Sequence, residues 1–151
     1  MDADISIRRI QPHAHASATR VWQSSWESAG VGHPNDLSYA ALLKKFREEL
    51  ATSWDLYVAD HEGKIIGLLA LKPSQNQIDQ LFIAPEYQRR GIGKLLLNFA
   101  KNRLPNEIWL RTAEQNKRAI AFYALAGFEI DRVEARPEWD RNDIVIVWRA
   151  A

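Results

Sequence analysis

Alternating apolar and polar residues mark the segments of this chain that we expect to form strands. The first segment sets Ile5 and Ile7 against Ser6, which is typical of a strand with one covered face. A later segment, IIGLLAL, is apolar almost throughout, as expected when both faces of a strand are covered. The predicted strands are residues 5–9, 54–59, 64–71, 77–83, 107–111, 128–134 and 143–149.

Helical spacing separates these strands. Leu42, Phe46 and Leu50 recur every four residues, so they share one side of a helix that packs on the sheet. Helices are predicted over residues 13–28, from a cap at Asn35, Asp36 or Ser38 to residue 50, and over 91–104 and 117–126. Between elements we expect a break over 29–34 that includes His33, a hairpin turn over 60–63 and a longer loop over 135–142.

The transition from the strand ending at Ile83 to the helix beginning at Gly91 carries the first candidate chemistry. It reads Gln-Arg-Arg-Gly-Ile-Gly-Lys over residues 88–94. The first N–H groups of a helix have no internal partner, and the helix dipole makes this end positive. Arginine and lysine add full charges, and glycine lets a ligand approach the main chain. The segment therefore predicts a binding site for phosphate groups.

Two better-known phosphate loops do not fit this segment. A Walker A loop requires Gly five residues before Gly93 and Ser or Thr after Lys94, but Gln88 and Leu95 stand there. A dinucleotide-binding fingerprint requires a third small residue where this chain has Leu96. A nucleotide-binding protein with the same glycine turn is therefore a disfavoured alternative.

A second motif lies downstream and reads LRTAEQNKRAIAFYALAGFE over residues 110–129. Asn116 suits the start of a helix, Tyr123 lies on one side of that helix, and Gly127 suits its end. Together with the glycine turn at the right separation, this motif resembles the signature of the GNAT superfamily of N-acetyltransferases, which bind acetyl-coenzyme A (acetyl-CoA). The resemblance is close over residues 65–128.

The resemblance implies a mixed α/β fold. GNAT enzymes have a central, mostly antiparallel sheet that is splayed between its fourth and fifth strands, with about four helices. We expect residues 1–151 to form a single domain of this kind, because a chain of 151 residues without repeats or linkers suits one domain.

The resemblance also implies a place for acetyl-CoA. In such enzymes the strand corresponding to residues 77–83 carries a bulge, and the pantetheine arm of the cofactor lies in the splay and bonds to the main chain. An opened strand edge has N–H and C=O groups that an amide-bearing arm can satisfy. The residues implicated are Leu81, Phe82 and Ile83 for the arm, Asn116 beside it, and Arg89, Arg90, Gly91, Ile92, Gly93 and Lys94 for the diphosphate.

The implied reaction is direct transfer of an acetyl group from acetyl-CoA to a primary amine. Tyr123 matches the family's tyrosine near the sulfur, and it can protonate the leaving thiolate because a tyrosine hydroxyl has a pKa of about 10. Many members carry a glutamate base where this chain has Gln77 and Arg111. Asp79, Glu114 and a chain of water molecules are the alternative bases.

The resemblance places the acceptor, a small-molecule or peptide amine, against the N-terminal helices and the loop before the last strand. Trp22 and Trp26 lie four residues apart on one helix face; they either pack on the sheet or wall the acceptor pocket. Arg111, in place of an acid, could bind a carboxylate of the acceptor.

Composition narrows the class of protein. A formal net charge of +1 favours neither nucleic acid nor an anionic membrane as partner, and no apolar run reaches the length of a membrane span. The absence of cysteine excludes disulfides, thiolate metal sites and a cysteine acyl carrier, and it agrees with a cytoplasmic location. No metal is expected, and a homodimer is considered because dimers are common in similar proteins. A non-catalytic acyl-CoA-binding module is the alternative to an enzyme.

Overall fold

The computed structural model describes residues 4–29 and 38–151, and of residues 25–29 and Trp139 it describes the backbone alone. One sheet runs through the described part of the chain. It has seven strands in the order β1-β2-β3-β4-β5-β7-β6. The strands are β1 (Ile5–Arg9), β2 (Asp55–His61), β3 (Lys64–Lys72), β4 (Gln77–Ile83), β5 (Glu107–Ala113), β6 (Glu129–Arg136) and β7 (Arg141–Arg149). All neighbouring strands are antiparallel except β4 and β5, which are parallel. The mixed, mostly antiparallel sheet is confirmed.

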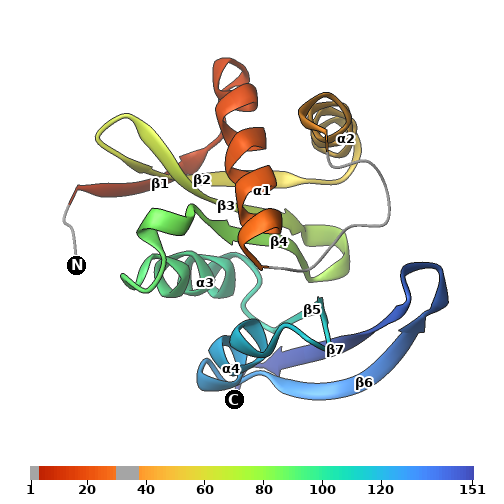
Figure 1. Ribbon diagram of the computed structural model, residues 1–151. Helices are drawn as coiled ribbons and strands as arrows, with labels where there is room; N and C mark the ends of the chain where they lie inside the picture. The colour runs from red at the N-terminus through yellow and green to blue at the C-terminus, as the bar shows by residue number, and fades with distance from the viewer. Residues whose placement is uncertain (1–3, 30–37) are drawn as a thin grey trace.

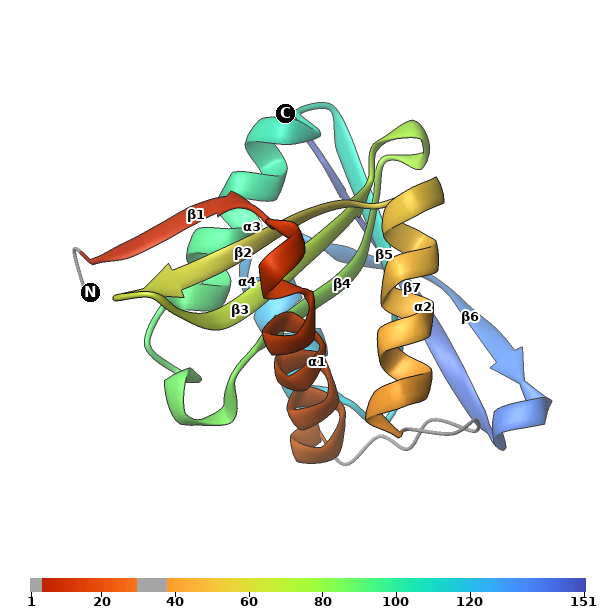
Figure 2. The same cartoon turned by 90° about the horizontal axis from the view of Figure 1, so that it is seen from above.

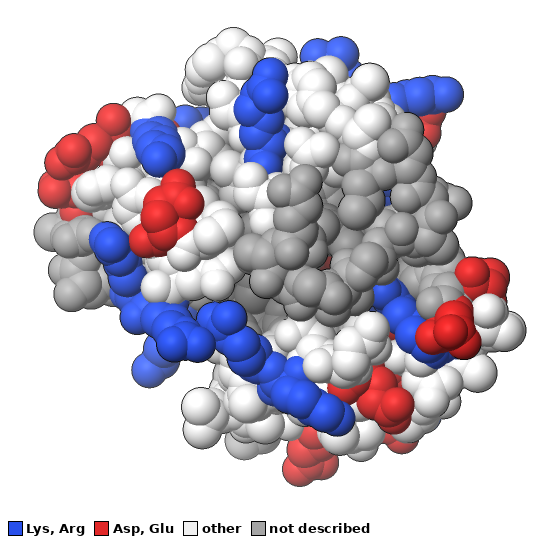
Figure 3. Space-filling model, viewed as in Figure 1, with Lys and Arg blue, Asp and Glu red and all other residues white. Residues whose placement is uncertain are grey.

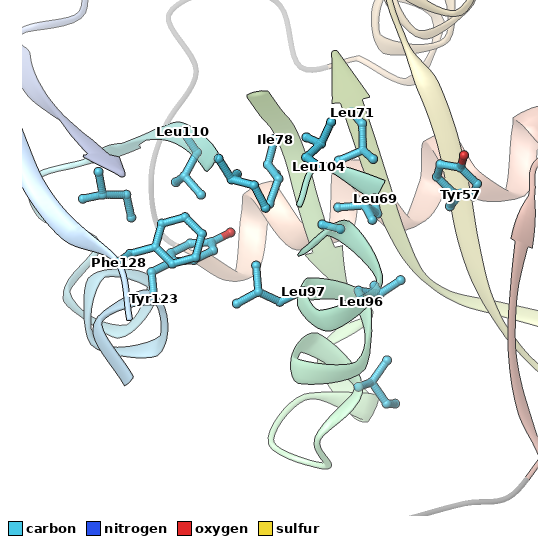
Figure 4. Packing of buried hydrophobic residues seen from close by; sticks show 14 of the residues in the cluster. Tyr57, Leu69, Leu71, Ile78, Leu96, Leu97, Leu104, Leu110, Tyr123 and Phe128 are labelled. Carbon is cyan, nitrogen blue, oxygen red and sulfur yellow. The ribbon is translucent and has the colours of Figure 1, made fainter. Parts of the chain in front are cut away.

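Helices cover both faces of the sheet (Figures 1 and 2). They are α1 (His15–Ala29), α2 (Tyr39–Thr52), α3 (Ile92–Arg103) and α4 (Lys117–Leu125). An apolar cluster that includes Trp22, Phe46 and Trp54 lies between α1, α2 and strands β2 and β3. A second cluster, which includes Leu96 and Tyr123, lies on the opposite face under α3 and α4 (Figure 4). The central strands are therefore buried on both faces, as the unbroken apolar run in β3 predicts.

The helix ends follow the local chemistry of their residues. The Oγ of Ser38 accepts a hydrogen bond from the N–H of Ala41 at 3.2 Å and caps α2; Asn35, Asp36 and His33, also considered above, lie outside the described residues. Asn116 caps α4 through its Oδ1, which accepts from the N–H of Ala119 at 3.2 Å. Gly127 follows α4 with a φ of +94°, a conformation that glycine adopts without a Cβ clash.

Two predicted connections are shorter in the structure. The β2–β3 turn consists of Glu62 and Gly63, both with positive φ, while Asp60 belongs to β2 and accepts a hydrogen bond from the N–H of Gly63 at 2.8 Å. The loop expected over 135–142 is wrong, because β6 and β7 continue until Arg136 pairs with Arg141. Charged rather than apolar residues occupy this end of the hairpin, so apolar alternation does not reveal it.

Among residues 4–29 and 38–151, no helix has the length and the apolar content that crossing a bilayer requires. The same residues form no group of three or more His, Asp or Glu side chains that could hold a metal ion.

Candidate active site

The pairing between β4 and β5 is confined to one end of these strands. Gln77 and Trp109 are the paired positions, and the N–H of Trp109 donates to the carbonyl of Asn76 at 3.0 Å. Beyond this point the strands separate, and Figure 1 shows β5 and β7 turning away from β4. We call this opening between β4 and β5 the splay. Its position between the fourth and fifth strands is as expected.

A bulge in β4 lies next to the splay. Ala70 of β3 pairs with Gln80 and Leu71 pairs with Ile78, so Asp79 is an extra residue without a counterpart on β3. The bulge that the resemblance implied for this strand is therefore present.

The ladder between β3 and β4 determines which main-chain groups face the splay. The N–H of Ala84 donates to the carbonyl of Ile66 at 2.8 Å. Alternation along an antiparallel pair then directs the main-chain groups of Phe82 toward β3, and those of Leu81 and Ile83 toward the splay. The Ile83 carbonyl accepts a hydrogen bond from Nε2 of Gln88 at 3.1 Å, which ties the following loop to this strand.

The loop that follows β4 ends in the conformation expected of a ligand-binding turn. Gly91 is the N-cap of α3, with a φ of +83° and no side-chain cap, and nothing lies within 4 Å of a Cβ placed on it. The N–H groups of Ile92, Gly93 and Lys94 in the first helical turn therefore have no intrahelical partner. Arg89 is a non-glycine residue with positive φ, +64°, which is uncommon and usually associated with a constrained turn.

Gly93 also lies at the contact between α3 and α4. A Cβ on Gly93 would lie 3.3 Å from Cζ of Phe122, so this glycine permits close packing between α3 and α4.

Positively charged side chains surround the starts of α3 and α4. Arg89, Arg90 and Lys94 are exposed, as are Lys117 and Arg118 in the first turn of α4. In Figure 3 a row of Lys and Arg side chains crosses this face over α3 and α4. An anion at the start of α3 would therefore meet both the helix dipole and full charges.

Tyr123 projects from α4 into the second apolar cluster. Its side chain is 6% exposed, and its ring packs edge-on against Phe122 and Phe128, with centroids 5.0 and 5.3 Å away. Figure 4 shows the hydroxyl pointing away from Phe128 into the space flanked by Leu97 and Leu110. Burial raises the pKa of this hydroxyl above its usual value, so Tyr123 stays protonated at neutral pH and can only donate a proton.

The candidate bases occupy different surroundings. The Oδ2 of Asp79 accepts a hydrogen bond from Nε1 of Trp54 at 2.7 Å and lies 3.8 Å from Nζ of Lys72. Asp79 therefore faces the side of the sheet that carries α1 and α2, beside the splay. Glu114, just beyond the end of β5, accepts a hydrogen bond from Asn142 at 3.4 Å. The chain offered no sequence signal for the contact between Trp54 and Asp79, which are 25 residues apart.

Of the two tryptophans of α1, the structure describes the side chain of Trp22 alone. Trp22 is 1% exposed, and its ring packs against Phe46 and Trp54 at 6.3 and 5.6 Å. The structure thus contradicts a pocket-wall role for Trp22 and supports core packing. Trp26 lies in α1, but its side chain is outside the described residues.

Arg111 lies on β5 on the same side of the sheet as Asp79. Its Nε donates to Oε1 of Glu134 at 2.8 Å, and its guanidinium lies 4.7 Å from the ring centroid of Trp109. The sequence predicted neither partner. The structure therefore places the glycine turn and Tyr123 on one side of the sheet and Asp79 and Arg111 on the other, with the splay opening through the sheet between β4 and β5.

Comparisons with known proteins agree with this geometry. A family model described as the acetyltransferase (GNAT) family matches residues 18–128. A probable N-acetyltransferase of Mycobacterium tuberculosis is 33% identical over 145 residues, covering 85% of this chain and 82% of the relative. A peptidyl-lysine N-acetyltransferase of Escherichia coli is 34% identical over 126 residues, covering 82% of this chain and 83% of the relative.

Among solved structures, the PaiA N-acetyltransferase of Thermoplasma acidophilum, crystallised in complex with coenzyme A, matches with a TM-score of 0.77. The match covers 99% of both chains at 22% sequence identity, and it shows that the two chains share a fold.

Proposed function

Because the chain belongs to the acetyltransferase (GNAT) family, we propose that it transfers an acetyl group directly from acetyl-CoA to a primary amine. The observation that carries this proposal is the splay beside the start of α3. Main-chain groups of Leu81 and Ile83 face the opening, and helix N–H groups without a side-chain cap lie one short loop away.

The donor fits these groups by shape and charge. Its pantetheine arm, which carries amides, would bond to Leu81 and Ile83 as an added strand does. Phe82, which the resemblance also implicated, is not expected to bond to the arm, because its main-chain groups face β3 and its side chain packs against the cluster under α1 and α2. The diphosphate would lie on the N–H groups of residues 91–94, with Arg89 and Arg90 beside it. Asn116 would contact the arm from the start of α4.

Two residues of this chain then carry out the two proton transfers of the reaction, one as the base and one as the acid. Acetyl-CoA supplies the activated acetyl group as a thioester. Asp79, held by Trp54, accepts a proton from the amine, which must be neutral to attack. As the new C–N bond forms and the C–S bond breaks, Tyr123 donates its proton to the departing sulfur. Main-chain N–H groups of β4 stabilise the charge that develops on the carbonyl oxygen.

A lysine side chain in a peptide is the first acceptor class to test. The E. coli relative is named a peptidyl-lysine N-acetyltransferase, and this chain has 34% identity with it over most of both proteins. A small-molecule amine is the second class.

The single domain, the homodimer and the cytoplasmic location stay predictions from the sequence.

Release of free thiol from acetyl-CoA across a panel of amines tests the proposal. The chain has no cysteine, so a thiol-reactive dye reports the product without background from the protein. We expect amine-dependent thiol release and an acetylated product of matching amount. Binding of acetyl-CoA without turnover on any amine would instead indicate the non-catalytic acyl-CoA-binding module.

A further inference from the structure

Three neighbouring strands present a charged face on the side of the sheet opposite α3 and α4. Strand register aligns Arg111, Val145 and Arg132 in one row across β5, β7 and β6, and aligns Ala113, Asp143 and Glu134 in the next. The apolar cluster under α1 and α2 takes no described member from these strands. We call the side chains of Arg111, Arg132, Arg136 and Arg141 on this side the arginine face.

Carboxylates hold the arginine face in place. Glu134 accepts hydrogen bonds from Arg111 at 2.8 Å, from Arg132 at 3.1 and 3.2 Å, and from Arg136 at 3.3 Å. Asp143, which is 4% exposed, pairs with Arg136 and Arg141 at 3.2 and 3.0 Å. Several guanidinium groups thus share each carboxylate, and the face retains positive charge.

Arg111 and its neighbour Arg132 differ in how many of their guanidinium nitrogens bond to carboxylates of the described residues. Arg132 uses all three of its nitrogens on Asp131 and Glu134. Arg111 uses Nε on Glu134, whereas Nη1 and Nη2 form no hydrogen bond within the described residues. Its side chain is 37% exposed, and its guanidinium carbon lies 4.7 Å from the ring centroid of Trp109, within range of a cation–π interaction. Two parallel donors held in this way match the two oxygens of a carboxylate.

Arg111 lies across the splay from Asp79, the proposed base. β4 and β5 pair at Gln77 and Trp109, and Asp79 and Arg111 each lie two residues further along their strands. Two residues of a strand span about 7 Å. Asp79 and Arg111 therefore flank the splay, each a short distance beyond the point where the strands pair, and both face away from α3.

We infer that this enzyme prefers an amine acceptor that also carries a carboxylate, on the same residue or on the next one, and that Arg111 binds this carboxylate while the amine lies at Asp79. The inference rests on the proposed acetyl transfer and names the class of its acceptor. The carboxylate has two sources, the free carboxyl group of an amino acid or an acidic residue next to lysine in a peptide.

Paired acceptors test the inference. One pair is Nα-acetyl-lysine and Nα-acetyl-lysinamide; the other is two short peptides in which Glu or Gln follows the lysine. We expect wild-type kcat/KM to be about tenfold higher for the charged member of at least one pair, with most of the difference in KM, as for one hydrogen bond to a charged group. The pair that shows the difference identifies the source of the carboxylate.

Two variants with equal loss of charge complete the design. In Arg111→Gln the tenfold preference should disappear, because kcat/KM should fall about tenfold more for the charged acceptor than for the neutral one. Arg132→Gln, two strands and about 10 Å away, should keep the preference. Should Arg111→Gln fold poorly, Arg111→Lys keeps the charge beside Glu134 but lacks the paired donors, and should lose at least half of the preference.

Two results would overturn the inference alone: transfer to amines with no preference in either pair, or a preference that persists in Arg111→Gln. An absence of transfer to every amine, neutral ones included, would overturn the proposed function and the inference with it.

Discussion

In the proposed mechanism each proton transfer depends on one residue, and the surroundings of that residue determine whether it donates or accepts the proton. Tyr123 is buried among aromatic rings, which raises the pKa of its hydroxyl, so it is suited to donate a proton. Asp79 is fixed by Trp54 at 2.7 Å and its side chain is 23% exposed, so it is suited to accept one. The sequence predicted Tyr123 as the acid and left Asp79 and Glu114 open as bases, and the proposed mechanism uses Asp79 because it lies beside the splay.

Replacement of Tyr123 by Phe removes the hydroxyl and leaves the packed ring. We expect kcat to fall between ten- and a hundredfold, the lower range for general acid catalysis, with little change in coenzyme A affinity. Because the pKa of this tyrosine is raised above its usual value of about 10, the hydroxyl stays protonated as pH rises, and wild-type kcat should not fall between pH 8 and 10. An unchanged kcat in Tyr123→Phe would remove it from the mechanism.

Replacement of Asp79 by Asn keeps an oxygen for Trp54 but removes the base. We expect kcat to fall about a hundredfold, with the melting temperature within a few degrees of wild type. Glu114→Gln is the matched control and should change kcat less than about threefold. If the control loses as much activity as Asp79→Asn, the base is assigned to the wrong carboxylate.

Among the elements, the local sequence predicts the bounds of the glycine turn well and the length of the β6–β7 hairpin poorly. Local signals fixed the start of α3, the cap of α4 at Asn116 and the bounds of β4, because each depends on neighbouring residues. The length of the hairpin and the role of Gly93 depend on contacts between distant segments. Gly93 lies against Phe122 of α4, and at the end of the hairpin an ion pair between Arg136 of β6 and Asp143 of β7 takes the place of apolar alternation.

The glycine turn can be tested with a matched pair of substitutions. Gly91 and Gly63 both have φ near +85°, and the space that a Cβ would enter is open at both, so Glu at either position introduces similar strain of about 1–2 kcal/mol. Gly91→Glu also places a negative charge at the start of α3, and should weaken coenzyme A binding at least a hundredfold by calorimetry. Gly63→Glu, in the β2–β3 turn and outside the proposed diphosphate site, should leave affinity unchanged. Equal affinities would exclude the turn as the diphosphate site.

The hairpin is predicted to contribute stability that depends on pH. The hydrogen bond from Arg111, with help from Arg132, lowers the pKa of Glu134. A lowered pKa stabilises the fold above the unfolded value of about 4.3 and loses that contribution as pH falls through the folded value. Glu134→Gln should therefore lower the free energy of unfolding at pH 7 by less than about 1 kcal/mol, as for partly exposed ion pairs. By pH 3 the difference should shrink, and a constant difference would contradict the ion pair.

The whole molecule is arranged around a sheet that is closed at one end of the β4–β5 pair and open at the other. Alternation and helical spacing predicted the type and order of its elements. The splay came only with the resemblance to a family, because pairing between β4 and β5 joins segments separated by a helix. The place of β7 between β5 and β6 was not predicted. The tryptophan-rich start of the chain was the least predictable part, since Trp22 would show the same spacing in a core as in a pocket wall.

A crystal structure of the protein with coenzyme A tests the central claim most directly. The account predicts the pantetheine arm between β4 and β5, bonded to Leu81 and Ile83, with its sulfur near the hydroxyl of Tyr123 and its diphosphate on the N–H groups that begin α3. Coenzyme A bound elsewhere, or a sheet whose hydrogen bonds close the gap between β4 and β5, would contradict it.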